Sequence, residues 1–391
     1  MMKFKETKRG VCTDGFKAAG IRKKGYGVAL IAAYAPCKAA GVFTKDSVKA
    51  APVVLSKKRV KGDIQTIISN SGCANACTPK GLEDAEEMAS IAAKTLGLNP
   101  SDVAVASTGL IGKKLDLKTI KSLTKEAATQ LSSSGKASLQ AAKAIMTTDT
   151  KPKQYSIEYH GVQVGGIAKG AGMIHPDLAT MLCFITTNAK LTKRILQSCL
   201  KKSAGQSFNM LSIEGDMSTN DTVLLLSSGE KVVKTSVFQN MLDQVTRELA
   251  KMIAKDGEGA SKFIEVQFKG ASTRKDAEKA AKAIVSSPLV KTAIYGQNPN
   301  WGRIAAKAGE VIKVKFDKMS ITFSSNNGKA KVLSKGVGIK SGNAKTLRLA
   351  RKILTSKEIQ IVVDLGEGKS EATAWGCDMT PEYVRINAEY N

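Results

Sequence analysis

The sequence predicts a mixed α/β protein, of the α+β kind, with a large first domain and a smaller second one. Helical and strand-like hydrophobic spacings alternate along the whole chain. The sequence contains no internal repeat with a period of about 20–50 residues. The chain is 391 residues long, which exceeds what one compact core usually contains. Its composition is 42% hydrophobic, which is enough to fill a buried interior. We expect a core domain over residues 1–280 and an α+β domain over residues 281–391.

The first domain should alternate strands with helices. Strand-like runs cover residues 27–33, 64–69 and 103–107. A helix should begin at Asp84, in an acidic first turn, and end before Gly97. Residues 154–167 alternate in hydrophobicity around His160 and Gly161, which predicts a β-hairpin. Further helical spacing covers residues 117–131, 191–203 and 234–255.

A short, alanine-rich helix is expected over residues 276–285, at the boundary between the two domains. Asn327 and Gly328 form a typical hairpin turn between two strand-like runs. A helix is expected over residues 345–354. The predicted strands of this domain cover residues 311–316, 321–324, 331–333 and 360–364.

The formal charge of +26 could attract anionic partners such as nucleic acids, anionic membranes or acidic small molecules. The basic residues are spread over the whole length, without a Lys/Arg block and with few aromatic residues beside them. This pattern is typical of a solvated surface, so specific nucleic-acid binding is not expected and stays only as the lesser alternative. A membrane span is not expected either, because no run of about 18 apolar residues occurs.

The cysteines and histidines limit the chemistry that the chain can perform. The seven cysteines are odd in number and scattered, which favours a reducing cytoplasm over a disulfide framework. Cys73 and Cys77 lack a second Cys or His pair, so we expect no metal site. Of the two histidines, His160 falls in the predicted turn, which leaves His175 as the one candidate for a catalytic imidazole. An enzyme built on this inventory is expected to use a base other than histidine.

The glycines of the sequence predict no nucleotide cofactor. The segment from Gly109 to Lys114 has the wrong glycine spacing for a phosphate loop, and no Ser or Thr follows its lysines. The glycines between residues 165 and 172 do not form the dinucleotide-binding pattern.

The segment from Lys169 to Leu182 carries the strongest chemical signal. Its glycines allow a close backbone approach, and they lead to Ala179 followed by Thr180. A threonine hydroxyl can attack the preceding carbonyl and cut the chain there, which leaves the threonine at a new N-terminus. Its own α-amine, with an ordinary pKa of about 7.7–8.0, can then serve as the base that the histidines do not provide. By itself an Ala-Thr step after glycines is more often a plain junction between a loop and a strand.

The whole segment resembles the hallmark of the glutamate N-acetyltransferase (ornithine acetyltransferase) family of arginine biosynthesis. The resemblance continues in the family's order over nearly the whole chain. It includes Gly41-Val-Phe-Thr44, Lys49-Ala-Ala-Pro52, Asn70-Ser-Gly-Cys-Ala-Asn-Ala-Cys77, Ser107-Thr-Gly-Leu-Ile-Gly112, Met146-Thr-Thr-Asp-Thr150, Gly215-Asp-Met-Ser-Thr-Asn-Asp-Thr222, Asp256-Gly-Glu-Gly-Ala-Ser-Lys262, Asn298-Pro-Asn-Trp-Gly-Arg303, Trp375-Gly-Cys-Asp378 and Tyr383-Val-Arg-Ile-Asn-Ala-Glu-Tyr390.

The resemblance implies a layered α-β-β-α catalytic core and self-cleavage between Ala179 and Thr180. The products would be an alpha chain, residues 1–179, and a beta chain, residues 180–391, assembled as a heterotetramer of two alpha and two beta chains. The implied reaction transfers an acetyl group from N-acetylornithine to glutamate by a ping-pong mechanism through acetyl-Thr180. No resident cofactor is implied, and whether acetyl-CoA also serves as an acetyl donor stays open.

The resemblance also implies individual roles. Thr180 is the nucleophile, and Thr108 and Gly109 form the oxyanion hole. The substrate-binding residues, besides Thr180 itself, are Thr147, Lys169, Glu258 and Asn387, with Thr148 as a rival to Thr147.

Three departures from the family pattern stand out. Cys73 and Asp177 each stand where asparagine is usual, and the chain stops at Asn391, before the family's usual C-terminal hydroxyl contact. The nearest alternative function is an amidohydrolase or aminopeptidase that uses the same self-cleaved nucleophile with water as the acceptor.

Overall fold

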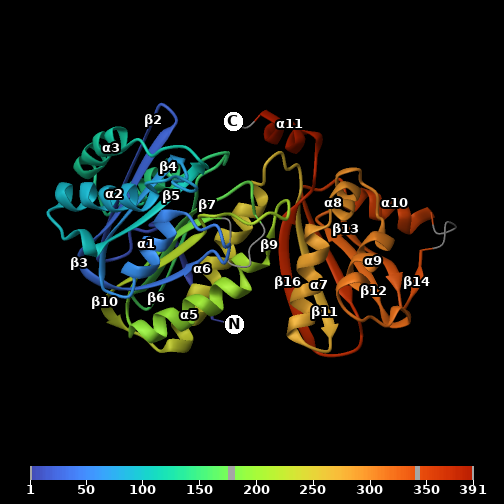
Figure 1. Ribbon diagram of the computed structural model, residues 1–391. Helices are drawn as coiled ribbons and strands as arrows, with labels where there is room; N and C mark the ends of the chain where they lie inside the picture. Colours follow the sequence, from blue (N-terminus) through green and yellow to red (C-terminus); the bar gives the residue numbers. More distant parts are fainter. Residues whose placement is uncertain (1, 175–180, 340–343, 390–391) are drawn as a thin grey trace. The chain divides into compact units, whose positions relative to one another are not determined.

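The computed structural model describes residues 2–174, 181–339 and 344–389. The chain divides into two compact units (Figure 1). The first unit comprises residues 1–209 and 217–253, and the second comprises residues 210–216 and 254–391. The division therefore lies near residue 254 rather than at the expected residue 280. The reason is that the strand over residues 263–271 pairs within the second unit.

The first unit contains nine strands and six helices within the described residues. They are β1 (Lys5–Thr7), β2 (Phe16–Lys23), β3 (Tyr26–Phe43), α1 (Ala51–Arg59), β4 (Ile64–Cys73), α2 (Gly81–Leu96), β5 (Val103–Leu110), α3 (Leu117–Thr129), α4 (Gly135–Ala144), β6 (Lys153–Tyr159), β7 (Val162–Lys169), β8 (Leu182–Lys190), α5 (Lys193–Gln206), β10 (Thr222–Val232) and α6 (Thr235–Lys255).

The long strand β3 belongs to two sheet layers at once. Its first half pairs with β2 and β4, and β4 pairs in turn with β5. Its last residues pair with β10, which continues the order β10-β8-β7-β6-β1. Residues on β3 alternate between two cores, as expected for a strand buried on both faces. Ala29 and Ile31 contribute to the core shared with β7, β8 and β10, whereas Val28 and Leu30 contribute to the core shared with α2 and α3.

Helices cover the outer faces of both layers. The helices α2 and α3 pack on the β2-β3-β4-β5 layer through Met88, Ile120 and Leu123. On the other layer, α5 packs against β3, and its Ser203 hydroxyl accepts a 2.8 Å hydrogen bond from Gln239 of α6. The first unit is therefore a layered α-β-β-α structure, which confirms the expected core architecture.

The second unit is a single mixed sheet with helices. Its sheet order is β14-β13-β12-β15-β11-β16-β9, with α7 against β11 and β16 and α10 against β12 and β13. No helix among the described residues of either unit is long and apolar enough to cross a membrane. The elements of the second unit are β9 (Leu211–Ser212), β11 (Phe263–Ala271), α7 (Arg274–Ser286), α8 (Pro288–Tyr295), α9 (Trp301–Val311), β12 (Ser320–Ser325), β13 (Gly328–Ser334), β14 (Val337–Gly338), α10 (Ala344–Ile353), β15 (Glu358–Asp364), β16 (Ser370–Cys377) and α11 (Pro381–Glu389).

One predicted strand is wrong. Residues 311–316 alternate in hydrophobicity, but Val311 ends α9 and Phe316 begins a short 3₁₀ helix. The side chains of Ile312 and Val314 are only partly buried, and no strand pairs with this segment among the described residues. The alternation there reflects a connection that rests on the surface of the unit. The predicted hairpin at His160 is confirmed, since β6 and β7 pair around a turn in which His160 has a positive φ of 48°.

Candidate functional site

Three strand ends meet in the first unit and bring the best candidate residues together. Thr108 and Gly109 lie at the end of β5, and Lys169 is the last residue of β7. Leu182, the first residue of β8 and the second after Thr180 in sequence, is the register partner of Lys169. The side chains meet directly, because the Lys169 ammonium donates a 3.3 Å hydrogen bond to the Thr108 hydroxyl oxygen.

This bond leaves the Thr108 hydroxyl proton available. An ammonium group only donates, so Thr108 is the acceptor and its own O–H can point elsewhere. A half-buried hydroxyl of this kind is suited to donate to an oxyanion.

Glycine is required at position 109 by its backbone. Its φ is 134°, a region that disfavours residues with a side chain. A β-carbon at this position would lie 2.4 Å from the backbone nitrogen of Cys73, so any side chain would push the end of β5 away from β4. Asn70-Ser-Gly-Cys73 and Ser107-Thr-Gly109 are therefore packed backbone against backbone.

The hub of the site is a buried carboxylate that sequence reasoning did not single out. Asp149 accepts a 2.7 Å hydrogen bond from the Lys153 ammonium and another, also 2.7 Å, from the backbone N–H of Gly170. Its second oxygen accepts from the backbone N–H of Thr147 at 3.0 Å and lies 4.0 Å from the Lys169 ammonium. Asp149 thus connects two of the predicted substrate-binding residues, Thr147 and Lys169.

The electrostatics of this hub favour a charged Asp149. Burial by itself raises the pKa of the carboxyl, but the charges of Lys169 and Lys153 and the hydrogen bonds from Lys153 and Gly170 outweigh it. The net effect lowers the pKa of Asp149 to about 2, so the group is ionised at neutral pH.

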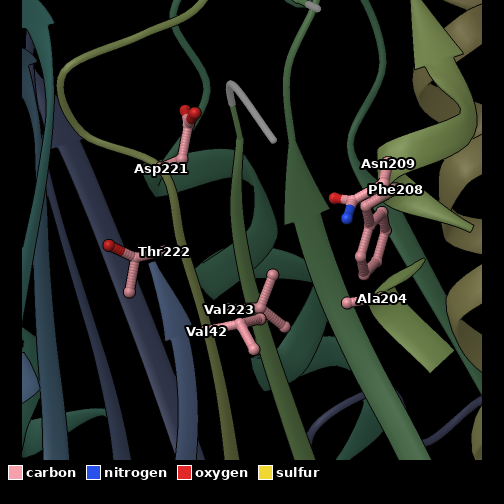
Figure 2. A pocket seen from close by; sticks show the side chains of 7 residues that line it. All are labelled: Val42, Ala204, Phe208, Asn209, Asp221, Thr222 and Val223. Atoms are coloured by element: carbon pink, nitrogen blue, oxygen red, sulfur yellow. The ribbon is translucent and has the colours of Figure 1, made fainter. Parts of the chain in front are cut away.

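A second buried acid lies beside the start of β8. Asp221 accepts a 3.0 Å hydrogen bond from the backbone N–H of Met181. Burial raises the pKa of Asp221 well above its ordinary value, against the opposing effects of the Met181 N–H, the Lys169 charge and the Ser218 hydroxyl. Asp221 and Asn209 are two of the seven residues that line a small pocket, all labelled in Figure 2. The remaining lining residues are mostly apolar: Val42, Ala204, Phe208, Thr222 and Val223.

Glu258 and Asn387 meet in the second unit. The Asn387 amide, on α11, donates a 2.9 Å hydrogen bond to the Glu258 carboxylate. The loop that carries Glu258 lies tightly against the start of α11, because Gly259 has a φ of 65° and a β-carbon there would lie 2.4 Å from the Tyr383 nitrogen. Burial, with the charges of Glu214, Glu258 and Asp216, raises the pKa of Tyr383 to about 12. Negatively charged side chains therefore gather around the start of α11.

The remaining predictions concern a segment outside the described residues and two cysteines. Ala179, Thr180, His175 and Asp177 lie in the undescribed segment 175–180. Cys73 is buried and donates from its thiol to the Lys113 carbonyl at 3.1 Å, whereas Cys77 is exposed. No group of three or more metal-ligating side chains occurs among the described residues.

The comparisons with known proteins agree with one family. The sequence model of the ArgJ family matches residues 14–391. The glutamate N-acetyltransferase of Methanocaldococcus jannaschii is 46% identical over 389 residues, which cover 96% of each chain. The arginine biosynthesis bifunctional protein ArgJ of Symbiobacterium thermophilum is 45% identical over 395 residues, covering 97% of this chain and 95% of that one.

Among solved structures, the arginine biosynthesis bifunctional protein ArgJ of Bacillus halodurans is 36% identical. It covers 53% of this chain and 98% of its own, with a TM-score of 0.49. From the family match and the relatives of nearly equal length, we conclude that this chain belongs to the ArgJ family.

Proposed function

We propose that this chain is a glutamate N-acetyltransferase, which moves the acetyl group of N2-acetylornithine to glutamate in arginine biosynthesis. Its membership of the ArgJ family supports this activity, as do the names of its relatives. The structural observation that carries the proposal is the contact of Lys169 with Thr108 opposite the start of β8. It joins a cation for a substrate carboxylate to a donor for an oxyanion, opposite Leu182, the second residue after Thr180 in sequence.

The mechanism that we propose is ping-pong and begins with self-cleavage. Thr180 attacks the carbonyl of Ala179, and water completes the cut, which frees the α-amine of Thr180. This amine takes the hydroxyl proton while the Thr180 oxygen attacks the acetyl carbonyl of N2-acetylornithine. The Thr108 hydroxyl and the Gly109 N–H donate to the tetrahedral oxyanion. Ornithine leaves with the proton. The amine of glutamate then attacks the carbonyl of acetyl-Thr180 and passes a proton to the α-amine of Thr180. The bond between the acetyl carbon and the Thr180 oxygen breaks, this oxygen takes the proton, and N-acetylglutamate leaves.

The proposed substrate contacts follow the charges. Both amino acids carry an α-carboxylate, which a buried ammonium such as Lys169 can bind. The carboxylates of Glu258, Glu214 and Asp216 can attract the ammonium group of a substrate. The Asn387 amide beside Glu258 can serve as donor or acceptor. The backbone N–H of Thr147 donates to Asp149, whose carboxylate also faces Lys169. This bond keeps Thr147 beside the Asp149–Lys169 pair and favours it over Thr148.

Three finer statements belong to the proposal. We expect a heterotetramer of alpha and beta chains, in a reducing cytoplasm, without a resident cofactor. Acetyl-CoA as an additional acetyl donor is open to test, because a transfer assay with acetyl-CoA and glutamate alone separates the two kinds of enzyme.

The assay that tests the activity follows acetyl transfer with purified protein. Incubation with N2-acetylornithine and glutamate should yield ornithine and N-acetylglutamate in equal amounts. Ornithine release that is equally fast without glutamate, and yields free acetate, would support the amidohydrolase alternative instead.

Replacement of Thr108 should slow the transfer itself. Thr108→Ala removes one oxyanion donor, so kcat is expected to fall by about 10²–10³-fold with a smaller change in KM. Steady-state kinetics with both substrates measures this change. Thr95→Ala is the matched control, since Thr95 is also partly buried but donates to a carbonyl within α2. Equal kcat values for the Thr108→Ala and Thr95→Ala variants would contradict the oxyanion role.

Replacement of Asn387 should weaken substrate binding. Asn387→Ala removes the amide beside Glu258. We expect KM to rise by about two- to twelvefold with kcat nearly unchanged, since one hydrogen bond to the substrate contributes about 0.5–1.5 kcal/mol. The control is Asn327→Ala, because Asn327 is a partly buried asparagine of the same unit that donates to the Lys352 carbonyl at 3.0 Å. The same KM for both variants would remove Asn387 from the site.

A further inference from the structure

Two adjacent buried side chains, Asn220 and Asp221, are not used by the proposed reaction. They stand immediately before β10 and are 7% and 2% exposed. Their hydrogen bonds reach β5, the loop after β4, and the residue before β8, all within the first unit.

Asn220 fixes the end of β5. Its amide nitrogen donates to the carbonyl oxygen of Ser107 at 2.9 Å and to that of Ala74 at 2.7 Å. Its amide oxygen accepts from the Thr219 hydroxyl at 2.6 Å. Both donors of the amide are therefore used, and an aspartate could not replace it without placing a carboxylate against two carbonyl groups. Ser107 is the residue bonded to Thr108.

Asp221 and its neighbour fix the start of β8 from both sides. The Asp221 carboxyl accepts from the Met181 N–H at 3.0 Å, and the Thr222 N–H donates to the Met181 carbonyl at 3.0 Å. The Asp221 carbonyl in turn accepts from the Thr44 N–H at 3.0 Å. Met181 is the residue bonded to Thr180.

We propose that Asn220 and Asp221 are positioning residues: they hold Ser107, the neighbour of the Thr108 oxyanion donor, and Met181, which follows the Thr180 nucleophile in sequence. The inference rests on the proposed function. One dipeptide holds the chain neighbour of each reacting residue, so the loss of either bond frees Ser107 or Met181 to shift. Misplacement by about 1 Å costs an enzyme about 10²-fold in rate.

The burial of Asp221 supports a functional reason for its presence. An isolated carboxyl is costly to bury, and apolar residues fill such positions at lower cost. The burial raises the pKa of Asp221, and asparagine is a close substitute because it keeps the shape and one oxygen acceptor of the carboxyl without its charge.

The test compares Asn220→Ala, Asp221→Ala and Asp221→Asn with a structural control. Asn188→Ala is that control, because Asn188 is equally buried in the same unit. It accepts from the Gln163 N–H at 2.8 Å and donates to the Gly161 carbonyl at 2.9 Å, near the β6–β7 turn. Thermal unfolding shows that each variant is folded at the assay temperature. Intact mass gives the rate of self-cleavage, and kinetics gives kcat and KM.

We expect Asn220→Ala and Asp221→Ala to lose about 10²-fold in the rate of cleavage or in kcat, with KM changed far less. Asp221→Asn keeps an oxygen acceptor for Met181 and should recover most of this loss. Asn188→Ala should destabilise the protein without such a loss. If the Asn220→Ala and Asn188→Ala variants have the same rates of cleavage and the same kcat, while the wild type transfers acetyl groups, the inference is wrong. If the wild type itself transfers none, the proposed function fails first.

Discussion

Replacing Thr180 with alanine is expected to leave the chain uncut and inactive. Wild-type protein should give two masses, one for residues 1–179 and one for residues 180–391, whereas the Thr180→Ala variant should give one. The reason is that alanine has no hydroxyl to attack the preceding carbonyl and none to carry the acetyl group. The transfer rate should fall by about 10⁴-fold or more, since the nucleophile itself is lost.

Thr180→Ser is the matched control for this experiment. Serine keeps both the hydroxyl and the α-amine, so cleavage and transfer should continue at a reduced rate. An acetyl group should be found by mass spectrometry on the fragment that begins at residue 180 after brief incubation with N2-acetylornithine. A wild type that transfers acetyl groups while it stays in one piece would contradict the assignment of Thr180 as an N-terminal nucleophile.

The layout of the fold could be predicted where a segment carries its own signal. The helix α2 has an acidic first turn and a left-handed Gly97 as its end, and the β6–β7 hairpin has its turn at His160-Gly161. The double membership of β3 could not be predicted from spacing. Only its first residues, 27–33, show as a strand in the sequence, because its continuation reads Ala-Tyr-Ala-Pro-Cys-Lys. The strand crosses to the second layer only because β10 pairs with its last residues.

The residues of the candidate site also divide into those that the sequence could nominate and those that it could not. Thr108, Lys169 and Glu258 stand in motifs that resemble those of the family, so the sequence could nominate them as candidates. Asn220 is bonded to residues far away in the chain, such as Ser107, 113 residues apart, and Asp149 reaches beyond its near neighbours to Gly170, 21 residues further on. Such contacts leave no local pattern. The motifs Met146–Thr150 and Gly215–Thr222 resemble those of the family and so point to these segments. Only the three-dimensional arrangement identifies Asp149 and Asn220 as the side chains that bond to the neighbouring strands and loops.

The second large effect is expected from Asp149→Asn. This change takes the counter-charge from two ammonium groups, since the side chains of Lys153 and Lys169 are 2% and 9% exposed. Breaking a buried ion pair on one side costs about 3–5 kcal/mol of the free energy of unfolding. An asparagine would also turn its NH₂ group toward either the Thr147 N–H or the Gly170 N–H, which the carboxylate now accepts. Denaturant unfolding at neutral pH measures the loss, and KM should rise because Lys169 is no longer held.

The dependence on pH distinguishes this charge effect from simple misfitting. The lowered pKa of Asp149 means that its charge stabilises the folded state above the ordinary value of 3.8, and that this contribution is lost as the pH falls toward about 2. The difference in unfolding free energy between wild type and Asp149→Asn should therefore be constant near neutral pH and shrink below about pH 4. Asp63→Asn is the control, because its ion pair with Lys38 is 2.8 Å long but exposed, and such pairs contribute about 0–1 kcal/mol. A loss for Asp149→Asn as small as the loss for Asp63→Asn would show that the carboxylate is not the electrostatic centre of the site. A large loss that does not shrink in acid would attribute it to packing and hydrogen bonds rather than to charge.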